Sequence, residues 1–212
     1  MQYEVISTGS KGNAVVINKN ILIDCGVTWK ALSGVYQDLQ LVLLTHWHGD
    51  HFNRSTIKRL AKERPTLCFG CRDYLVSRLI ECGVLLRNID VYPESRPSLY
   101  SASLAIEAIP VPHDVENTAY RIIINDKRIF YCTDTNDVSH IDAKGYDYYF
   151  LEANYSEGEI VERIKSKQEN GEYCHEWDVL KNHLSKEKAE DWLYRNMEQH
   201  SQYVLLHEHK AS

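Results

Sequence analysis

The segment that most constrains this chain is residues 41–51, with the sequence LVLLTHWHGDH. Its apolar start is typical of a short buried strand, and the polar turn that follows carries three histidines and one aspartate within six positions. Neutral imidazoles and carboxylates are the usual ligands of zinc and similar divalent ions. In an extended stretch His46 and His48 face the same way, whereas Asp50 and His51 lie one bend further on. The segment therefore predicts two metal ions rather than one.

Histidines also occur as ordinary surface or core residues, and a single His-x-His pair would favour that simpler explanation. Here four ligand-type side chains stand close together, and Gly49 permits a tight bend between them. The pattern favours a metal site over a chance grouping.

The composition is that of an ordinary globular protein, with 43% hydrophobic and 25% charged residues among 212. No run approaches the roughly 18 apolar residues of a membrane span, and residues 1–20 lack a secretory pattern. We expect a cytoplasmic protein with no membrane contact. A net charge of -6 argues against a wholly basic nucleic-acid surface but leaves room for a local basic rim. No linker or repeat is visible, so residues 1–212 are expected to form one domain.

Hydrophobic periodicity predicts strands followed by alternating strands and helices. Strands are expected at 3–6, 14–17, 21–23, 66–69, 89–92, 104–111, 119–125, 128–133, 146–151 and 203–206. Helices are expected at 28–39, 53–64, 72–82, 156–167 and 186–197. The four strands between residues 89 and 133 are interpreted as an antiparallel run. Two sheets with helices on their outer faces accommodate this order.

Three further ligand-type residues each come directly after a predicted strand, namely His113, Asp134 and His207. Polar residues end most strands, so one such residue alone would carry no weight. Three of the right type indicate that they join the cluster in residues 46–51. His209 is the alternative to His207, and we choose His207 because it follows the apolar run directly.

The order of these ligand-type residues along the chain resembles that of the metallo-β-lactamase superfamily: His46, His48, Asp50, His51, His113, Asp134 and His207. The opening STGSKGNA and the segment LIDCG at residues 22–26 are also similar to that superfamily. The resemblance implies an α/β (α+β) fold, the four-layer αββα sandwich of two mixed sheets flanked by helices. It also implies a dinuclear metal site. Its ligands would be His46, His48 and His113 for one ion and Asp50, His51 and His207 for the other, with Asp134 bridging.

The implied site favours an anionic substrate. Two divalent ions bring four positive charges, and Asp50, Asp134 and a bridging hydroxide remove three. The ions would lower the pKa of the shared water and make it a nucleophile near neutral pH. Zinc suits the imidazole-rich ligation best, and manganese or iron fits the same donors. Asp24 would either hydrogen-bond a ligand imidazole or close the turn before Gly26. Ser10 and Asn13 would add hydrogen bonds near the site, or serve only as turn residues.

Departures within the family pattern narrow the chemistry. His48 replaces the Glu of the oxygen-reducing di-iron branch, and Asp134 replaces the Cys of the antibiotic-hydrolysing zinc enzymes. The segments FLEANY at 150–155 and NHLS at 182–185 are similar to the nuclease-like branch of YycJ-type exonucleases and tRNase Z. The chain has no room for a β-CASP insertion. The resemblance implies a metal-dependent hydrolase, a phosphodiesterase or nuclease acting on nucleic acid or a nucleotide, and analogy with relatives suggests a homodimer.

The histidine of the HLS segment approaches the substrate phosphate in that branch, which makes His183 the expected proton donor and Glu152 its orienting partner. His183 would otherwise merely precede a helix capped by Ser185. The alternative function is hydrolysis of a carboxylic ester, thioester or lactone, which needs only the metal core. A binding module with a degenerate site is disfavoured by the intact ligand set.

Overall fold

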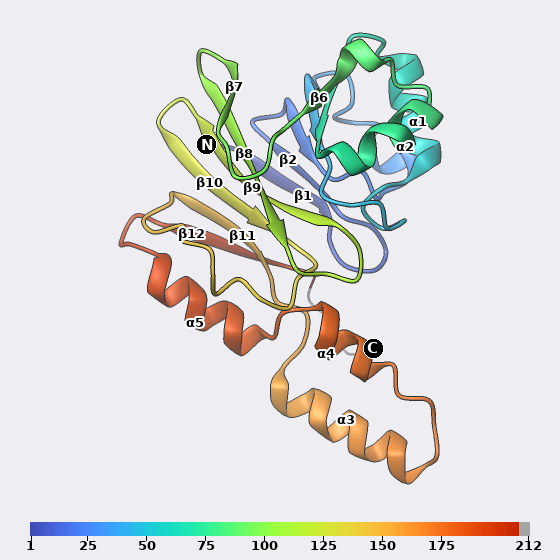
Figure 1. Cartoon of the computed structure of the whole chain (residues 1–212), viewed down its shortest axis with the longest axis vertical. Coiled ribbons are helices and arrows are strands. Elements are labelled where there is room, and N and C mark those ends of the chain that lie inside the picture. The colour runs from blue at the N-terminus through green and yellow to red at the C-terminus, as the bar shows by residue number, and fades with distance from the viewer. Residues whose placement is uncertain (208–212) are drawn as a thin grey trace. The chain divides into compact units, whose positions relative to one another are not determined.

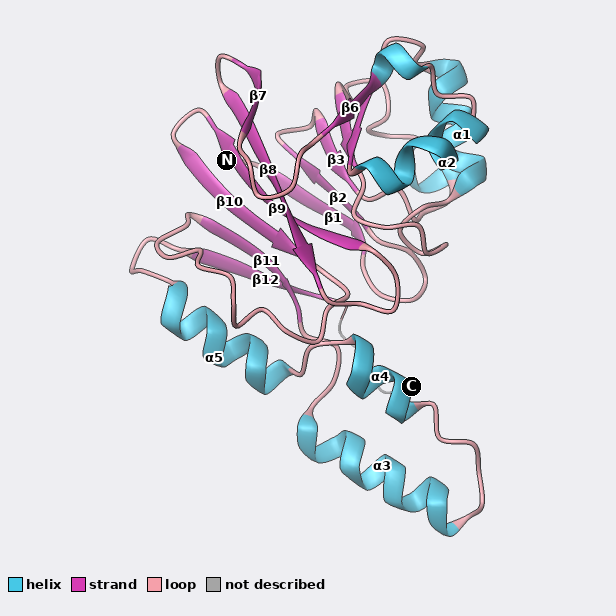
Figure 2. Ribbon diagram, viewed as in Figure 1, coloured by secondary structure: helices cyan, strands magenta, loops and turns pink. Residues whose placement is uncertain are grey.

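Residues 1–207 are described in the computed structural model of the chain. They form two compact units, Met1–Ile109 and Pro110–Ser212. The expectation of a single domain stays a prediction. Two mixed six-stranded sheets flanked by helices are present, which confirms the predicted fold class (Figures 1 and 2). None of the described helices is both long and apolar enough to cross a membrane.

The first unit contains a sheet with the strand order β1-β2-β3-β4-β5-β6, antiparallel from β1 to β3 and parallel from β3 to β6. A hairpin of β7 and β8 follows, and its strands belong to the second six-stranded sheet, which has the order β12-β11-β10-β9-β8-β7. The strands are β1 Tyr3–Ser7, β2 Ala14–Ile17, β3 Ile21–Ile23, β4 Leu41–Leu43, β5 Cys68–Cys71, β6 Ile89–Val91, β7 Ser98–Ser101 and β8 Leu104–Val111, and the helices are α1 Arg54–Glu63 and α2 Val76–Glu81.

Helices α1 and α2 cover this sheet because their apolar stripes match its buried face (Figure 1). Ile57 and Leu60 of α1 and Leu79 of α2 belong to the same buried cluster as Val42 and Phe69 of the sheet. This core fixes β4, and with it the position at which the metal-ligand segment leaves the sheet.

The second unit contains an antiparallel pair, β9 and β10, and β10, β11 and β12 then run parallel. Helix α5 packs along β11, and α3 and α4 pack together through a small apolar cluster (Figure 2). The strands are β9 Asn117–Ile124, β10 Lys127–Cys132, β11 Tyr148–Glu152 and β12 Gln202–Leu206, and the helices are α3 Glu157–Glu169, α4 Glu176–Asn182 and α5 Lys186–Asn196.

Two element predictions were wrong, and two elements were not expected. The helix expected at 28–39 is a short 3₁₀ helix, Trp29–Leu32, followed by turns, because Ser33 and Gly34 are poor helix formers. The strand at 89–92 is not part of an antiparallel run: β6 pairs parallel with β5, since the intervening helix carries the chain back to the same edge. Strand β7 and helix α4 were not expected, because their segments are polar and short.

The α3–α4 pair contains a buried ion pair between helices. Lys167 Nζ lies 2.8 Å from Glu176 Oε1, and Glu176 is 2% exposed. Burial alone would raise the pKa of Glu176, but hydrogen bonds, led by the one from Lys167, lower it to about 2. Because this pKa lies below the ordinary value of 4.5, the pair stabilises the fold above that value and is lost as the pH falls towards 2.

Lys167→Met should destabilise the protein by about 2 kcal/mol, because it leaves the Glu176 carboxylate buried without its cation. Urea unfolding measures this loss, and hydrogen exchange should localise it to residues 157–182. Arg195→Met is the matched control: it breaks an exposed i,i+4 pair with Asp191 and should cost less than about 1 kcal/mol. Equal effects of the two substitutions would contradict a stabilising role for the buried pair.

Candidate metal centre

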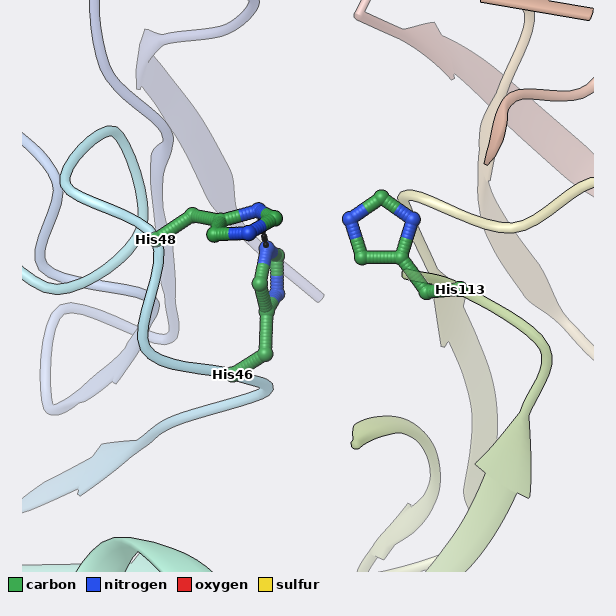
Figure 3. Close-up of side chains that lie close together, drawn as sticks. All are labelled: His46, His48 and His113. Atoms are coloured by element: carbon green, nitrogen blue, oxygen red, sulfur yellow. Dashed lines mark hydrogen bonds between the residues drawn. The ribbon is translucent and has the colours of Figure 1, made fainter. Parts of the chain in front are cut away.

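The residues of the 46–51 loop follow β4 directly and gather four ligand-type side chains in the first unit. His46 and His51 are fully buried, with ring centroids 4.3 Å apart. Nε2 of His46 lies 3.2 Å from Nδ1 of His48, and Figure 3 shows the two rings edge to face. Asp50 Oδ2 lies 3.7 Å from Nε2 of His51. The imidazoles of His46 and His48 therefore converge, as their spacing predicts.

Residue 13 and residues 24–26, which follow β3, hold this loop through backbone contacts. The Cys25 N–H donates to the His51 carbonyl at 2.9 Å, and the Asn13 N–H donates to the Asp50 carbonyl at 2.6 Å. A Cβ atom added at Gly26 would lie 1.6 Å from the Asp50 carbonyl oxygen. Only glycine leaves room for the two backbones to approach so closely.

Asp24 forms a hydrogen bond with a ligand-type imidazole, as expected. It is fully buried, and its Oδ2 accepts from Nδ1 of His51 at 2.8 Å. Its Oδ1 accepts from both the N–H and the hydroxyl of Thr45 at 2.9 Å. With the Nδ1 proton directed at Asp24, Nε2 of His51 carries the lone pair of the ring, which faces the Asn13 amide and which an ion would take in its place. The Asn13 amide nitrogen lies 2.7 Å from that Nε2, so Asn13 also borders the site.

The second unit brings together another set of donors at the ends of adjacent parallel strands. Asp134 follows β10, Glu152 ends β11 and His207 follows β12. His207 Nε2 lies 3.4 Å, and His183 Nδ1 3.6 Å, from Asp134 Oδ1. The four residues offer donor atoms within 4.8 Å of one another. Carboxyl ends of parallel strands meet at one sheet edge, which explains this convergence.

His183 is held by Glu152, which is fully buried. His183 Nδ1 lies 2.5 Å from Glu152 Oε1, and Glu152 Oε2 accepts from the Thr135 N–H at 2.8 Å and the Leu184 N–H at 3.4 Å. Burial alone would lower the pKa of His183, but the hydrogen bond and charge of Glu152, joined by Asp134, raise it above its ordinary value. Ser185 caps α5 by accepting from the Lys188 N–H, as expected.

His113 lies just after β8 and is half-buried (Figure 3). Its Nδ1 lies 3.2 Å from the Asn182 carbonyl and its Nε2 lies 3.1 Å from Asp114 Oδ1. The ring centroid of His113 is 5.8 Å from that of His183. His209, the alternative to His207, lies outside the described residues.

Asn154 is a site residue that the sequence prediction missed. Its amide lies 2.7 Å from Nδ1 of His207, and it is 4% exposed. An amide can offer either an acceptor or a donor to that nitrogen. His207 is therefore held from behind by a buried polar side chain, as His51 is held by Asp24. The sequence signal for Asn154 was its position two residues after Glu152, at the end of a strand.

The donor chemistry of both units fits divalent metal ions. Imidazole nitrogens and carboxylate oxygens, several of them buried and oriented by a second residue, are the set that zinc and similar ions take in proteins. The described residues contain groups of histidine and carboxylate side chains whose donor atoms lie close enough together to hold a metal ion.

The family of the chain follows from a match over residues 19–195 to the family described as Beta-lactamase superfamily domain. The chain belongs to this family. A curated relative, the anti-Pycsar protein Apyc1 of Paenibacillus sp. (strain J14), is 30% identical over 140 residues, which are 54% of this chain and 55% of the relative. The match therefore spans about half the length of that relative.

Two solved structures have the same fold. The metallo-β-lactamase fold protein YhfI from Bacillus subtilis matches with a TM-score of 0.72 and 17% identity, over 99% of this chain and 88% of that one. The short form of human tRNase Z matches with a TM-score of 0.71 and 14% identity, over 98% and 92%. The metallo-β-lactamase fold is thus confirmed.

Gly26→Ala should disturb the 46–51 loop, because the new methyl group meets a backbone carbonyl that no rotamer change can move. We expect a loss of about 3 kcal/mol in unfolding free energy and a lower metal content after dialysis against zinc. Gly34→Ala is the control, since nothing lies within 4 Å of a Cβ at that position. If Gly26→Ala matched Gly34→Ala in both stability and metal content, residues 24–26 would not position the loop.

Proposed function

We propose that the chain is a dinuclear metal-dependent phosphodiesterase or nuclease. In this proposal two divalent ions, zinc by preference, are held by the seven ligands expected from the sequence. They are His46, His48 and His113 for one ion, Asp50, His51 and His207 for the other, and Asp134 as the bridge. Within each unit, donor convergence and the residues that hold His51 and His207 from behind support this assignment.

The observation that carries the choice of a phosphodiester is the Glu152–His183 pair beside Asp134. A buried carboxylate that orients an imidazole supplies a general acid, and a phosphodiester has a poor leaving oxygen that benefits from one. Hydrolysis of a lactone, thioester or activated ester needs only the metal core and would make no use of this pair. The human tRNase Z neighbour carries a name in keeping with a nuclease.

The charges of the donor set support an anionic substrate. When bound, two divalent ions would lower the pKa of a water molecule and neutralise charge on the phosphoryl oxygens. The aspartates Asp50 and Asp134 offset only part of four positive charges, so the ligands leave a net positive centre. Nucleic acid and nucleotides, cyclic ones included, meet this requirement. A homodimer and a cytoplasmic location stay predictions.

The roles of the chain's own residues follow from their contacts. Asp24 holds the Nδ1 proton of His51, which fixes its tautomer. Glu152 takes the Nδ1 side of His183, so the Nε2–H is the proton that His183 would give to the departing oxygen. Asp50, whose carboxylate lies beside the His51 ring, would bind the same ion as His51.

Hydrolysis of bis(p-nitrophenyl) phosphate tests the reaction class. Activity should disappear after chelation, return when zinc or manganese is added, and be absent in an Asp50→Ala, His51→Ala variant. Release of p-nitrophenolate that survives chelation would contradict metal dependence. Turnover of a lactone or thioester without any turnover of the phosphodiester would replace the proposal with carbonyl hydrolysis.

His183→Ala should lower kcat by about 100-fold while the metal content stays that of the wild type, because a general acid is lost and no ligand is removed. Metal content is measured by plasma mass spectrometry on the samples used for kinetics. His175→Ala, an exposed histidine on the same unit, is the control. Full activity of His183→Ala would remove the proton-donor role, and a matching loss of metal would make His183 a ligand instead.

Asn154→Leu should weaken metal binding by about tenfold, because His207 loses the partner that orients its ring. Competition with a chromophoric chelator gives the affinity directly, without reference to activity. Asn154→Asp should retain or exceed the affinity of the wild type, since a carboxylate accepts from Nδ1 more strongly than an amide. Equal affinity of all three proteins would show that Asn154 serves packing alone.

A further inference from the structure

A surface pocket of about 500 Å³ in the first unit borders the 46–51 loop. Its lining includes Trp47 and Gly49 of that loop, and Arg54 and Ser55 at the start of α1. Arg78 of α2 completes it. None of the proposed metal ligands lines the pocket, but the ring of His48 lies against Trp47, so the pocket borders one of these ligands. None of the proposed catalytic roles uses it.

Trp47 forms a fixed aromatic surface in this pocket. The Arg78 guanidinium lies 4.3 Å from the centroid of the indole, and the centroids of the Trp47 and His48 rings are 5.3 Å apart, with an interplanar angle of 69°. Trp47 as a residue is nevertheless 39% exposed. An aromatic ring that is held on two sides and accessible on the rest is a stacking platform for a nucleobase.

The two arginines give the pocket a positive charge. Arg54 is exposed and pairs with Glu81 at 2.8 Å, an exposed ion pair that stabilises little and can open. A guanidinium binds a phosphate through two parallel hydrogen bonds. The Arg78 guanidinium lies over the indole and lines the same pocket, so it brings a second cation to it. The pocket therefore combines recognition of a flat ring with recognition of an anion.

We propose that this pocket binds the nucleotide unit next to the scissile phosphodiester, with its base on Trp47 and its phosphate on Arg54 and Arg78. This inference rests on the proposed phosphodiesterase function and narrows its substrate to one with an unpaired base and a second phosphate. An acidic peptide would leave the aromatic surface without a partner. A simple ester would leave both arginines without one.

The test compares two substrates that both release p-nitrophenolate. Bis(p-nitrophenyl) phosphate has no nucleoside, whereas the 5′-(p-nitrophenyl phosphate) of thymidine 3′-phosphate carries a base and a second phosphate. In an Arg54→Gln, Arg78→Gln variant, KM for the thymidine substrate should rise about tenfold with kcat retained. KM for the smaller substrate should not change. Arg87→Gln, an exposed arginine outside the pocket, is the control and should leave both values unchanged.

The outcomes separate the subsite from the catalytic proposal. Equal changes for both substrates, or none for the thymidine substrate, would overturn the subsite and leave the phosphodiesterase intact. If the wild type hydrolyses neither substrate, the proposed function fails, and calorimetric titration with thymidine 3′,5′-bisphosphate then decides the subsite alone. Binding that is lost in the double variant supports it, and no binding to the wild type overturns it.

Discussion

The interaction on which the first half of the candidate metal centre depends is the packing of residues 24–26 against the 46–51 loop. Asp24 is a fully buried carboxylate, and an uncompensated charge there would be strongly destabilising. Each of its oxygens is satisfied, one by Thr45 and one by His51. The same group that secures the loop to the end of β3 therefore also orients an imidazole. Stability and ligand geometry are properties of one contact.

In the second unit, ligand-type side chains are positioned by the ends of strands. Asp134 and His207 have left-handed backbone, with φ of 54° and 58°, as Asp24 has with 60°. Such a conformation is unfavourable for a residue with a side chain, and it persists only where surrounding structure imposes it. Asp24 and His207 each come one residue after the end of a strand, and Asp134 comes two residues after one. The parallel strands supply the rigid base that holds these residues.

The proposed ligand set rests on sequence signals that are local. Three histidines and an aspartate lie in six residues, and His113, Asp134 and His207 each follow an apolar run. The direction of β6 was not accessible, since its three residues read the same in a parallel or an antiparallel sheet. Asn154 was missed because an amide carries no ligand signature. The pairing of Trp47 with Arg78 was missed because it joins a loop to a distant helix.

The central claim is that the chain holds two divalent ions through the residues of both units. The most direct measurement is the metal-to-protein ratio by plasma mass spectrometry after zinc loading and removal of free metal. The account predicts two ions per chain in the wild type and fewer in separate His51→Ala and His207→Ala variants. A ratio of zero or one in the wild type, or an unchanged ratio of two in both variants, would contradict it.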